Sequence, residues 1–392
     1  MGVELNQGQR EFVAGASKWY RQGYQQRLEL TGGAGTGKST CIYAAIEEIG
    51  LQPDEVLFTA PTGKAAQVLT RKGCFTKTIH STIYNYSMET MLDEEGKPIM
   101  KNGRSAKKPT FTLKESLPEK TKLIVVDEGS MVQQNIGIDL ESFGIPIIVT
   151  GDLQQLPPVS SCEYFLKNPD FRLTEIMRQN EGNPIIHLAS LASQGKPIPF
   201  GRYGPKCFVI PRELITDKMM KESDVNLCGR NVTRSELNSH IRENILGINK
   251  PILTVGEKII CRKNNWNECI DEDIFLINGL SGFVENVYME DYNGAKFSID
   301  FRPDFTDKVF ERISVDYKHL FSPCGTQING FSAHNKFEFG NAITVHLSQG
   351  SQYKNVFFYS ERMGTRDFYN RLMYTGITRA EEGLILVKED ER

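Results

Sequence analysis

Residues 32–39 read GGAGTGKS and form the most informative chemical pattern in the chain. The segment fits the spacing G-x-x-x-x-G-K-[ST], in which backbone N–H groups surround phosphates, the lysine reaches the outer phosphates and the serine hydroxyl can bind Mg²⁺. Apolar residues precede it and a helical pattern follows it, which predicts a strand, a tight loop and a helix. We therefore predict a nucleotide-binding site whose loop consists of Gly32, Gly33, Ala34, Gly35, Thr36, Gly37, Lys38, Ser39 and Thr40.

Two neighbouring carboxylates predict what happens to the bound nucleotide. Residues 123–131 read LIVVDEGSM, so an apolar run ends at Asp127 and Glu128. Continuous apolarity is typical of a parallel strand covered on both faces, and such sheets bind ligands at the carboxyl ends of their strands. Asp127 is then the candidate Mg²⁺ ligand, and Glu128 the base that activates water. The alternative is a solvated acidic pair at the end of a core strand. Beside a phosphate loop, hydrolysis is the favoured interpretation.

Four further segments also place polar groups after an apolar strand. They lie at 58–69, 145–159, 340–359 and 372–387. Strands that alternate with helices predict parallel α/β layers. The motifs form two clusters, before about residue 180 and after about residue 340, so we predict an α/β fold with two lobes, of which only the first holds the phosphate loop.

Length and composition limit the class of protein. The 392 residues suit two to four domains, and a net charge of −3 excludes a uniformly basic coat for nucleic acid. No apolar run is long enough to cross a bilayer, and the first residues lack the pattern of a secretory signal. The eight cysteines include no C-x-x-C pair, which argues against a zinc or disulfide framework. We expect an intracellular, cytoplasmic protein without a membrane partner.

Taken together, the motifs resemble those of superfamily 1 helicases of the RecD/Dda-like, 5′-to-3′ branch. The matching segments are LNQGQ (5–9), GGAGTGKS, APTGKAA, TIH (78–80), VVDEGSM, GDLQQLPPV, LTEIMRQ (173–179), AITVHLSQG and YTGITRA. They occur in the family's order over nearly the whole chain. The resemblance implies two RecA-like parallel-sheet P-loop lobes, with a β-hairpin insert in the first and a small SH3-like β-barrel in the second.

The resemblance also implies roles for individual residues. It places Gln9 on the adenine, Gln155 between the γ-phosphate and the DNA side, and Gly350 at the ATP site. It makes Arg178 and Arg379 the two arginines that contact the γ-phosphate from the side of the second lobe. The DNA-facing positions that it implies are Pro61, Thr62, Lys64, His80, Thr344, His346 and Ser348. Three residues depart from the family pattern, because Leu347 replaces a usual lysine, Gln352 a frequent acidic residue, and Gly129 the Ala or Val that is common after Asp-Glu.

Positive charge is concentrated in the first insert. Residues 96–122 hold eight lysine and arginine side chains against two glutamates, a local charge of +6. Asn102-Gly103 is a strong turn signal, and PTFTL at 109–113 is typical of a strand. We predict a basic β-hairpin in which Phe111 acts as a wedge at the duplex fork or stacks on a base. A solvated lysine-rich loop is the alternative. The resemblance implies a strand-separating pin.

The predicted domains follow from these patterns. Short strand-like runs with Asn-Gly turns predict the barrel in the second insert. The predicted bounds are 1–80 and 121–194 for the first ATPase lobe, 81–120 for the hairpin, 195–250 and 326–392 for the second lobe, and 251–325 for the barrel.

We predict an ATP-dependent helicase that uses ATP and Mg²⁺ and moves along single-stranded DNA. The polarity, 5′ to 3′, comes only from the resemblance. Its expected partners are single-stranded DNA and a duplex fork, with replication or repair proteins as candidate protein partners. Three alternatives remain at this point. They are a nucleotide-gated clamp or loader that holds single strands, an RNA-directed motor of the same architecture, and a P-loop kinase or metabolic ATPase with no nucleic-acid partner.

Overall fold

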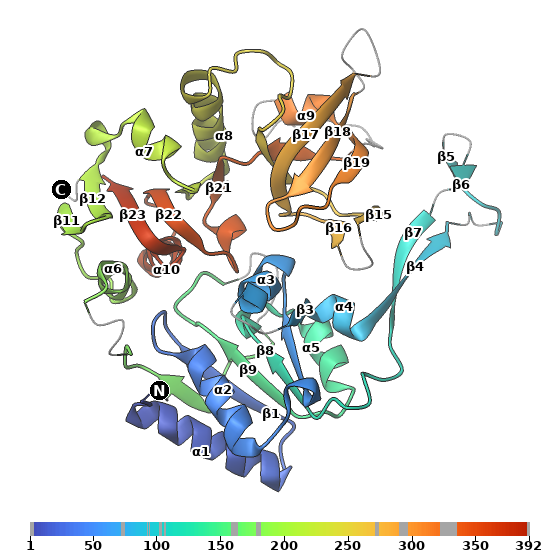
Figure 1. Ribbon diagram of the computed structural model, residues 1–392, viewed down its shortest axis with the longest axis vertical. Coiled ribbons are helices and arrows are strands. Elements are labelled where there is room, and N and C mark those ends of the chain that lie inside the picture. The colour runs from blue at the N-terminus through green and yellow to red at the C-terminus, as the bar shows by residue number, and fades with distance from the viewer. Residues whose placement is uncertain are drawn as a thin grey trace. The chain divides into compact units, whose positions relative to one another are not determined.

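The computed structural model describes residues 4–71, 75–91, 93, 95–101, 104–105, 107–157, 164–177, 182–270, 274–289, 297–321 and 335–389. The chain forms two compact units (Figure 1). Unit 1 comprises Met1–Tyr84, Leu113–Ile215 and Ser348–Arg392, and unit 2 comprises Asn85–Thr112 and Thr216–Leu347. The domain bounds that we predicted from the sequence stay a prediction.

A six-stranded parallel sheet is the centre of unit 1. Its order is β10 (Phe171–Leu173), β1 (Arg27–Gly32), β9 (Ile147–Gly151), β8 (Leu123–Val126), β2 (Val56–Ala60) and β3 (Thr76–Thr78). Every pair between neighbours is parallel. All residues of β8 and β9 are buried, as their continuous apolar sequences predicted. The predicted α/β fold is confirmed.

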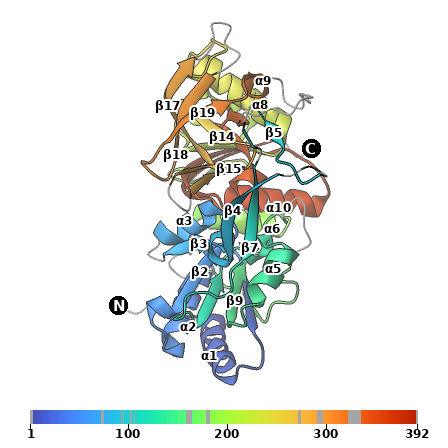
Figure 2. The same ribbon diagram turned by 90° about the vertical axis from the view of Figure 1, so that its right-hand side faces the viewer.

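Helices cover both faces of this sheet. Leu123 and Val125 of β8 pack in one apolar cluster with α1 (Gln7–Gln22) and α2 (Lys38–Ile49). Ile124 and Val126 face the other way, into a cluster with α4 (Ile79–Ile83) and α5 (Gln134–Glu141). The alternation follows from the period of two along a strand. Figure 2 shows α2 and α5 on opposite sides of these strands.

The last part of unit 1 contains a second group of strands. Their order is β11 (Gly201–Gly204), β12 (Cys207–Pro211), β23 (Ala380–Lys388) and β22 (Tyr353–Tyr359). The β11–β12 pair is antiparallel, and β23 runs parallel to both β12 and β22. The helices α6 (Pro184–Ser193) and α10 (Arg366–Ile377) pack against each other and against β23. The side chain of Thr365 accepts from the Phe368 N–H and so fixes where α10 begins.

Unit 2 combines a small parallel pair with an antiparallel sheet. The pair is β13 (Val225–Cys228) and β21 (Ala342–Thr344), and α8 (Asn231–His240) contacts both strands. The antiparallel sheet has the order β19 (Phe310–Val315), β18 (Phe297–Pro303), β17 (Ser281–Met289), β14 (Lys258–Cys261) and β20 (Phe337–Phe339). Phe301, Phe310 and Phe337 lie in its core. The second insert therefore consists of short strands as expected, and its SH3-like character stays a prediction.

The remaining elements of unit 2 include a hairpin and two small helices. The strands β15 (Asn265–Ile270) and β16 (Ile274–Leu276) pair antiparallel, and α7 (Asp217–Lys221) and α9 (Tyr317–Phe321) are single short helices.

Among the described residues, both units also contain short 3₁₀ and π helices. They are η1 (Pro53–Glu55), η2 (Gly129–Met131), η4 (Arg212–Leu214), η5 (Ile241–Ile245) and η6 (His346–Ser348). A short α-helix, α3 (Gly63–Arg71), follows β2 in unit 1.

The basic insert forms paired strands. Strand β4 (Tyr84–Thr90) pairs with β7 (Lys107–Leu113), and farther out β5 (Met100–Lys101) pairs antiparallel with β6 (Arg104–Ser105). Asn102 and Gly103, where we predicted the turn, lie outside the described residues. Phe111 lies in β7, where its ring contacts Tyr86 with the centroids 5.6 Å apart. It therefore sits in the stem of the hairpin and not in the part that joins β5 to β6.

Candidate nucleotide-binding site

The predicted phosphate loop connects β1 to α2. Gly35 and Gly37 have φ values of 77° and 82°, a left-handed conformation that glycine adopts with little strain. A Cβ at Gly37 would lie 2.5 Å from both Gln9 Nε2 and Met177 Sδ, so a larger residue here would displace these side chains. The Cys41 N–H donates to the Gly37 carbonyl and begins the helix directly behind the loop. The loop therefore has the strand, turn and helix that the sequence predicted.

Lys38 is bound to its own loop. Its ammonium group donates to the Gly32 carbonyl at 2.6 Å and to the Gly33 carbonyl at 3.3 Å. The Thr36 hydroxyl also donates to the Gly33 carbonyl, at 2.9 Å. These bonds hold the loop closed around the lysine side chain.

Gln9 is built into the same loop. Its side chain is buried, and Nε2 donates to the Thr36 carbonyl at 2.9 Å. Its Oε1 accepts from the Asn6 N–H, while the Asn6 side chain accepts from the Gln9 N–H, which makes a capping box at the start of α1. Gln9 therefore links the beginning of α1 to the phosphate loop.

Asp127 and Glu128 follow β8 at the carboxyl edge of the parallel sheet. The Asp127 N–H donates to the Thr59 carbonyl of β2, so the neighbouring strand fixes this residue. Glu128 has a φ of 52°, unusual for a residue with a side chain and found most often where function requires it. The chain then turns tightly against β9 at Gly129. Glycine permits this approach, because a Cβ at Gly129 would lie 2.3 Å from Val149 Cγ1.

The environment of Glu128 raises its pKa to about 7, from an ordinary value of 4.5. Burial is the main cause, and the negative charge of Asp127 adds to it, followed by that of Asp152. The positive charges of Arg379 and Lys38 act in the opposite direction. Lys38, Asp152 and Arg379 therefore all act electrostatically on Glu128, although they come from segments far from it in the sequence.

Arg379 is a buried arginine just after α10. Its Nε donates to the Thr375 carbonyl at 3.1 Å and Nη1 to the Ser351 carbonyl at 3.0 Å. Nη2 donates to the Thr378 hydroxyl at 3.3 Å. The guanidinium group is therefore held in one orientation by the end of α10 and the chain before β22, while its charge reaches Glu128.

One face of α10 binds the loop after β9. The Tyr374 hydroxyl donates to Asp152 Oδ2 at 2.6 Å and accepts from the Ala34 N–H at 2.7 Å. The Leu156 N–H donates to the Thr375 hydroxyl at 2.9 Å, and Arg371 Nη1 donates to the Leu153 carbonyl at 3.1 Å.

Residues 371, 374 and 375 were missed as site residues by the sequence reasoning. Their spacing of three and four places them on one helix face, four to eight residues before Arg379, and that signal could have identified them. Gln349 was missed as well, and its Nε2 donates to the Leu156 carbonyl at 2.6 Å.

The predicted DNA-facing residues lie in both units. In unit 1, the Thr62 hydroxyl accepts from the Ala65 N–H at 3.2 Å at the start of α3, and His80 is exposed on α4 with its ring centroid 5.6 Å from that of Tyr84. The Lys64 ammonium group is buried, and Ser348 is fully buried. Pro61 is half-buried directly after β2.

The other predicted positions have different surroundings. A Cβ at Gly350 would lie 3.0 Å from the Thr62 hydroxyl, so Gly350 lies beside the start of α3. In unit 2, Thr344 is buried in β21 and His346 is half-buried in η6. Arg178 lies outside the described residues. Gln155 is half-buried, with its Nε2 3.5 Å from Asp152 Oδ2.

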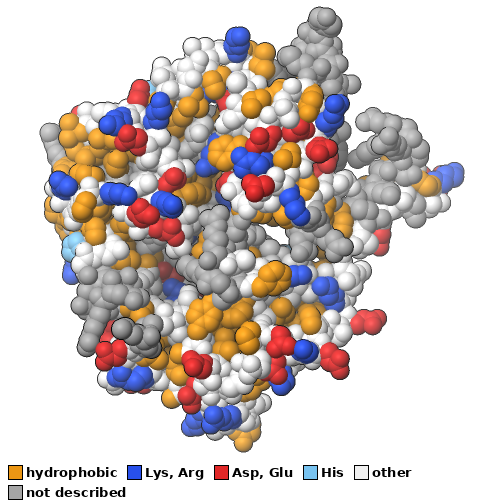
Figure 3. Space-filling view, viewed as in Figure 1, with side chains coloured by type: hydrophobic (Ala, Val, Ile, Leu, Met, Phe, Trp, Pro, Cys, Tyr) orange, Lys and Arg blue, Asp and Glu red, His pale blue; other side chains and the backbone are white. Residues whose placement is uncertain are grey.

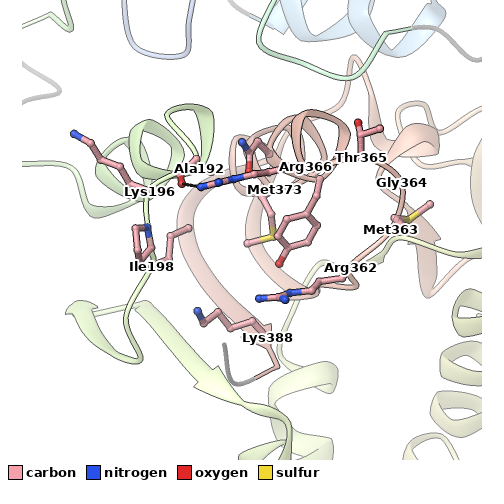
Figure 4. A pocket seen from close by; sticks show the side chains of 14 residues that line it. Ala192, Lys196, Ile198, Arg362, Met363, Gly364, Thr365, Arg366, Met373 and Lys388 are labelled. Atoms are coloured by element: carbon pink, nitrogen blue, oxygen red, sulfur yellow. Dashed lines mark hydrogen bonds between the residues drawn. The ribbon is translucent and has the colours of Figure 1, made fainter. Parts of the chain in front are cut away.

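A separate cavity of about 340 Å³ lies beside the start of α10 (Figure 4). None of the predicted site residues lines it, and its basic side chains are Lys196, Arg362, Arg366 and Lys388. Arg366 Nη2 donates to the Gly195 carbonyl at 3.1 Å, and the Lys388 ammonium group lies 5.1 Å from the centre of the Phe200 ring. These contacts join α10 and β23 to the segment that follows α6.

Charge is mixed over the face drawn in Figure 3, where lysine and arginine side chains alternate with aspartate and glutamate. Among the residues that the structure describes, no helix is both long and apolar enough to cross a membrane. Within the same residues, no group of three or more His, Cys, Asp or Glu side chains could hold a metal ion without other ligands.

Comparison with known protein families identifies the family to which this chain belongs. The family described as "AAA domain" matches residues 4–206, and the family described as "UvrD-like helicase C-terminal domain" matches residues 339–387. The first match contains the phosphate loop, both carboxylates and Gln155, and the second contains Arg379. The chain belongs to the superfamily 1 helicases of the RecD/Pif1-like type.

Individual helicases are similar over different lengths. The ATP-dependent RecD2 DNA helicase of Deinococcus radiodurans is 26% identical over 381 residues, which cover 90% of this chain and 46% of that protein. The ATP-dependent DNA helicase PIF1 of Emericella nidulans is 32% identical over 150 residues, 34% of this chain and 18% of that protein. This chain therefore spans less than half the length of these curated helicases.

Two solved structures share the fold. A chain from a structure of two coordinating Pif1 helicases at forked double-stranded DNA has a TM-score of 0.51 and 18% identity, covering 98% of this chain and 92% of that one. Pif1 from Bacteroides, in complex with ADP-AlF3 and single-stranded DNA, has a TM-score of 0.50, with the same identity and coverage. At this identity the similarity concerns the helicase fold alone.

Proposed function

We propose that this chain is an ATP-driven helicase that moves along single-stranded DNA and separates a duplex at a fork. The observation that carries the proposal is the phosphate loop between β1 and α2, with Lys38 bonded inside it and Asp127 and Glu128 following β8 at the carboxyl edge of the same sheet. A phosphate-binding lysine, two carboxylates and an arginine held by a separate helix are the parts that phosphoryl transfer to water requires. The family membership and the RecD2 relative support DNA as the track.

The phosphate loop binds the nucleotide in this proposal. The backbone N–H groups between Gly32 and Thr40 surround the phosphates, and the start of α2 adds the positive end of its helix dipole. Lys38 exchanges its bonds to the Gly32 and Gly33 carbonyls for the outer phosphate oxygens. Gln9 contacts the adenine with the hydrogen-bonding capacity that remains on its amide, because its Nε2 has two protons and uses one on Thr36.

The residues around the loop fit Mg²⁺. This ion prefers oxygen ligands, keeps several waters, and is usually held by one or two carboxylates together with the substrate phosphates. Ser39 has a hydroxyl in the first turn of α2, and Asp127 has a carboxylate on a residue fixed through its backbone bond to β2. An incomplete protein ligand set of this kind suits an ion that arrives with the nucleotide. When bound, Mg²⁺ would neutralise charge on the β- and γ-phosphates.

Glu128 and Arg379 then promote hydrolysis. Glu128 accepts a proton from the attacking water, and its raised pKa makes it a better base at neutral pH than an ordinary glutamate. Arg379 stabilises the charge that develops on the γ-phosphate, and the family resemblance gives Arg178 the same task. Gln155 and Asp152 lie in the same loop after β9. In this proposal Gln155 links the presence of the γ-phosphate to the DNA-binding residues.

The DNA-binding residues and the direction of movement are also part of the proposal. In this proposal the DNA-contacting residues of unit 1 are His80, Pro61 and Thr62, and those of unit 2 are Thr344 and His346. Lys64 and Ser348 support DNA-contacting residues from inside the fold, since Ser348 and the Lys64 ammonium group are buried. The family resemblance assigns Gly350 to the ATP site. The basic hairpin separates the strands, with Phe111 in its stem. The family resemblance supports movement from 5′ to 3′, and replication or repair proteins are the candidate partners.

An ATPase assay with and without oligonucleotides tests this function. We expect single-stranded DNA to stimulate hydrolysis by at least about tenfold, with RNA and duplex DNA of equal length less effective. Stimulation by RNA alone would favour an RNA-directed motor. Hydrolysis that ignores every nucleic acid would contradict the proposal and favour a metabolic P-loop ATPase. Stimulation without any unwinding of a forked duplex would favour a clamp or loader.

A further inference from the structure

The Tyr374 hydroxyl makes two hydrogen bonds inside the candidate site. The side chain is 2% exposed, and its Oη lies 2.7 Å from the Ala34 nitrogen and 2.6 Å from Asp152 Oδ2. A phenol has one proton, the Ala34 amide can only donate, and an ionised carboxylate can only accept. The phenol proton therefore points to Asp152, and the Ala34 N–H points to the phenol oxygen. Burial and the charge of Asp152 raise the pKa of Tyr374, so it keeps this proton.

The Asp152 carboxylate, which accepts from Tyr374, also contacts the loop that contains Gln155. Its side chain is 3% exposed, and Oδ1 accepts from the Gln154 N–H at 3.0 Å. Oδ2, the oxygen that binds Tyr374, is also 3.5 Å from Gln155 Nε2. The position of one carboxylate therefore affects both the phosphate-loop side and the side chain of Gln155.

The adjacent residue of α10 makes a parallel connection. The Thr375 hydroxyl accepts from the Leu156 N–H, while the Thr375 carbonyl accepts from Arg379 Nε. One turn of α10 thus contacts the phosphate loop, the loop after β9 and the buried arginine. A movement of any of these parts changes the hydrogen-bond geometry of the other two.

We propose that Tyr374 is a positioning residue that couples occupancy of the phosphate loop to Gln155 and Arg379. When a nucleotide binds, the loop rearranges around the phosphates and the bond between Ala34 and Tyr374 changes. Tyr374 then shifts Asp152, and with it the Gln155 side chain. The inference rests on the proposed ATPase function. It assigns a role to Tyr374, which begins the YTGITRA segment and had none in the sequence analysis.

The Tyr374→Phe variant removes both hydrogen bonds and keeps the ring that packs in the core. Loss of a hydrogen bond to a charged group slows a step that depends on it by about ten- to a hundredfold. We therefore expect kcat of the DNA-stimulated ATPase to fall at least about tenfold, with the KM for ATP within about threefold of the wild type. The matched control is Tyr369→Phe, on the same helix and lining the separate cavity, which should retain the wild-type kcat. Thermal unfolding shows whether each variant is folded.

A double-mutant cycle with Asp152→Asn separates coupling from general damage. If Tyr374 acts through Asp152, the double variant should be no slower than the slower single variant. Effects that multiply in the double variant, or a Tyr374→Phe enzyme with the wild-type kcat, would overturn the inference. The pair Tyr369→Phe and Asp152→Asn should multiply, because Tyr369 is not part of the bridge.

Nucleotide binding without DNA distinguishes this inference from the proposed function. Fluorescent ADP is displaced by ADP or by a non-hydrolysable ATP analogue, and the ratio of the two affinities is compared between the wild type and Tyr374→Phe. We expect the variant to reduce this ratio by at least about fivefold, because the bridge is the route by which the loop responds to the γ-phosphate. An unchanged ratio would contradict the role of Tyr374, even if DNA stimulates the ATPase. A wild type that DNA does not stimulate would contradict the helicase, whatever the ratio.

Discussion

The Lys38 ammonium group donates to the Gly32 carbonyl at 2.6 Å, so the phosphate-binding lysine is bonded to the first glycine of its own motif. Lys38 therefore has two tasks, since it stabilises the shape of the loop and is the cation for the outer phosphates. An ammonium group that already lies in the loop is positioned before the nucleotide arrives.

Replacement of Lys38 by alanine should remove the ATPase and leave the fold intact. The loss of a charge-assisted contact to the transferred phosphoryl group slows hydrolysis by about a hundredfold or more. Steady-state ATPase with saturating single-stranded DNA measures this, and circular dichroism checks the fold. Lys18→Ala, an exposed lysine on α1, is the control and should behave as wild type. A Lys38→Ala enzyme with more than a tenth of the wild-type rate would contradict the assignment.

The raised pKa of Glu128 predicts the pH dependence of hydrolysis. Because the pKa is about 7, the carboxyl group is protonated below neutrality and cannot accept a proton from water. We expect kcat/KM, which reflects the free enzyme, to rise with pH up to about 7 and then level off. A profile that is already flat at pH 5 would contradict a base with this pKa. The Glu128→Gln variant should have no such rise, and a rate reduced by about a hundredfold or more.

The same shift predicts that Glu128 destabilises the folded protein at high pH. Its folded pKa lies above the unfolded value of 4.5, so between these values the folded state binds the proton and the unfolded state does not. Stability attributable to this group therefore falls as the pH rises from 4.5 to 7 and stays low above 7. At pH 8, Glu128→Gln should raise the Tm, with an increase in the free energy of unfolding of at most about 3 kcal/mol. At pH 5 the substitution should have little effect on the Tm. A Glu128→Gln variant whose Tm exceeds that of the wild type at pH 5 but not at pH 8 would contradict this prediction.

Thiol reactivity tests the packing around the phosphate loop. Burial raises the pKa of Cys41, behind the loop, to about 12, and those of Cys207 and Cys261 to about 11, whereas Cys269 is exposed. Only the thiolate reacts rapidly, so at pH 8 iodoacetamide should label Cys269 at least about tenfold faster than these three. Peptide mass spectrometry at timed intervals measures each site, with the unfolded protein as the control for equal labelling. Labelling of Cys41 as fast as Cys269 would mean that α2 is not packed as described.

Tyr86 connects the hairpin stem to the β15–β16 hairpin. Its ring centroid lies 5.6 Å from that of Phe111 and 4.9 Å from that of Phe275. Each such aromatic contact contributes about 0.5–1.5 kcal/mol, so Tyr86→Ala should loosen the stem. We expect unwinding of a forked duplex to slow by about threefold or more. The ATPase on single-stranded DNA should change less than about twofold, because the ring of Tyr86 packs on Phe111 and Phe275, which belong to the two hairpins. Tyr86→Phe keeps the ring and should unwind normally, and equal losses of ATPase and unwinding in Tyr86→Ala would contradict a role limited to the stem.

The sequence was most informative where neighbouring residues determine the structure. The loop from Gly32 to Ser39 needs only its own glycines and the adjacent strand and helix, and the buried strand before Asp127 is apparent from four apolar residues. The capping box of Asn6 and Gln9 is equally local, although we did not use it to place Gln9 beside Thr36.

Contacts between distant segments could not be predicted in the same way. Tyr374 and Ala34 are 340 positions apart, and only the packing of α10 against the loop after β9 brings them together. The family resemblance implied that Ser348 faces DNA, and its complete burial in this fold is not contained in the motif. The pKa of Glu128 also depends on charges from four different segments, which no local pattern contains.

Unwinding of duplexes that carry only a 5′ or only a 3′ single-stranded tail tests the central claim most directly. With ATP and Mg²⁺, the wild type should unwind the 5′-tailed DNA duplex and leave the 3′-tailed one largely paired. The Lys38→Ala variant should unwind neither. No unwinding of either DNA duplex by a folded, ATP-hydrolysing wild type would contradict the proposed helicase, and unwinding of the 3′-tailed duplex alone would contradict the proposed polarity.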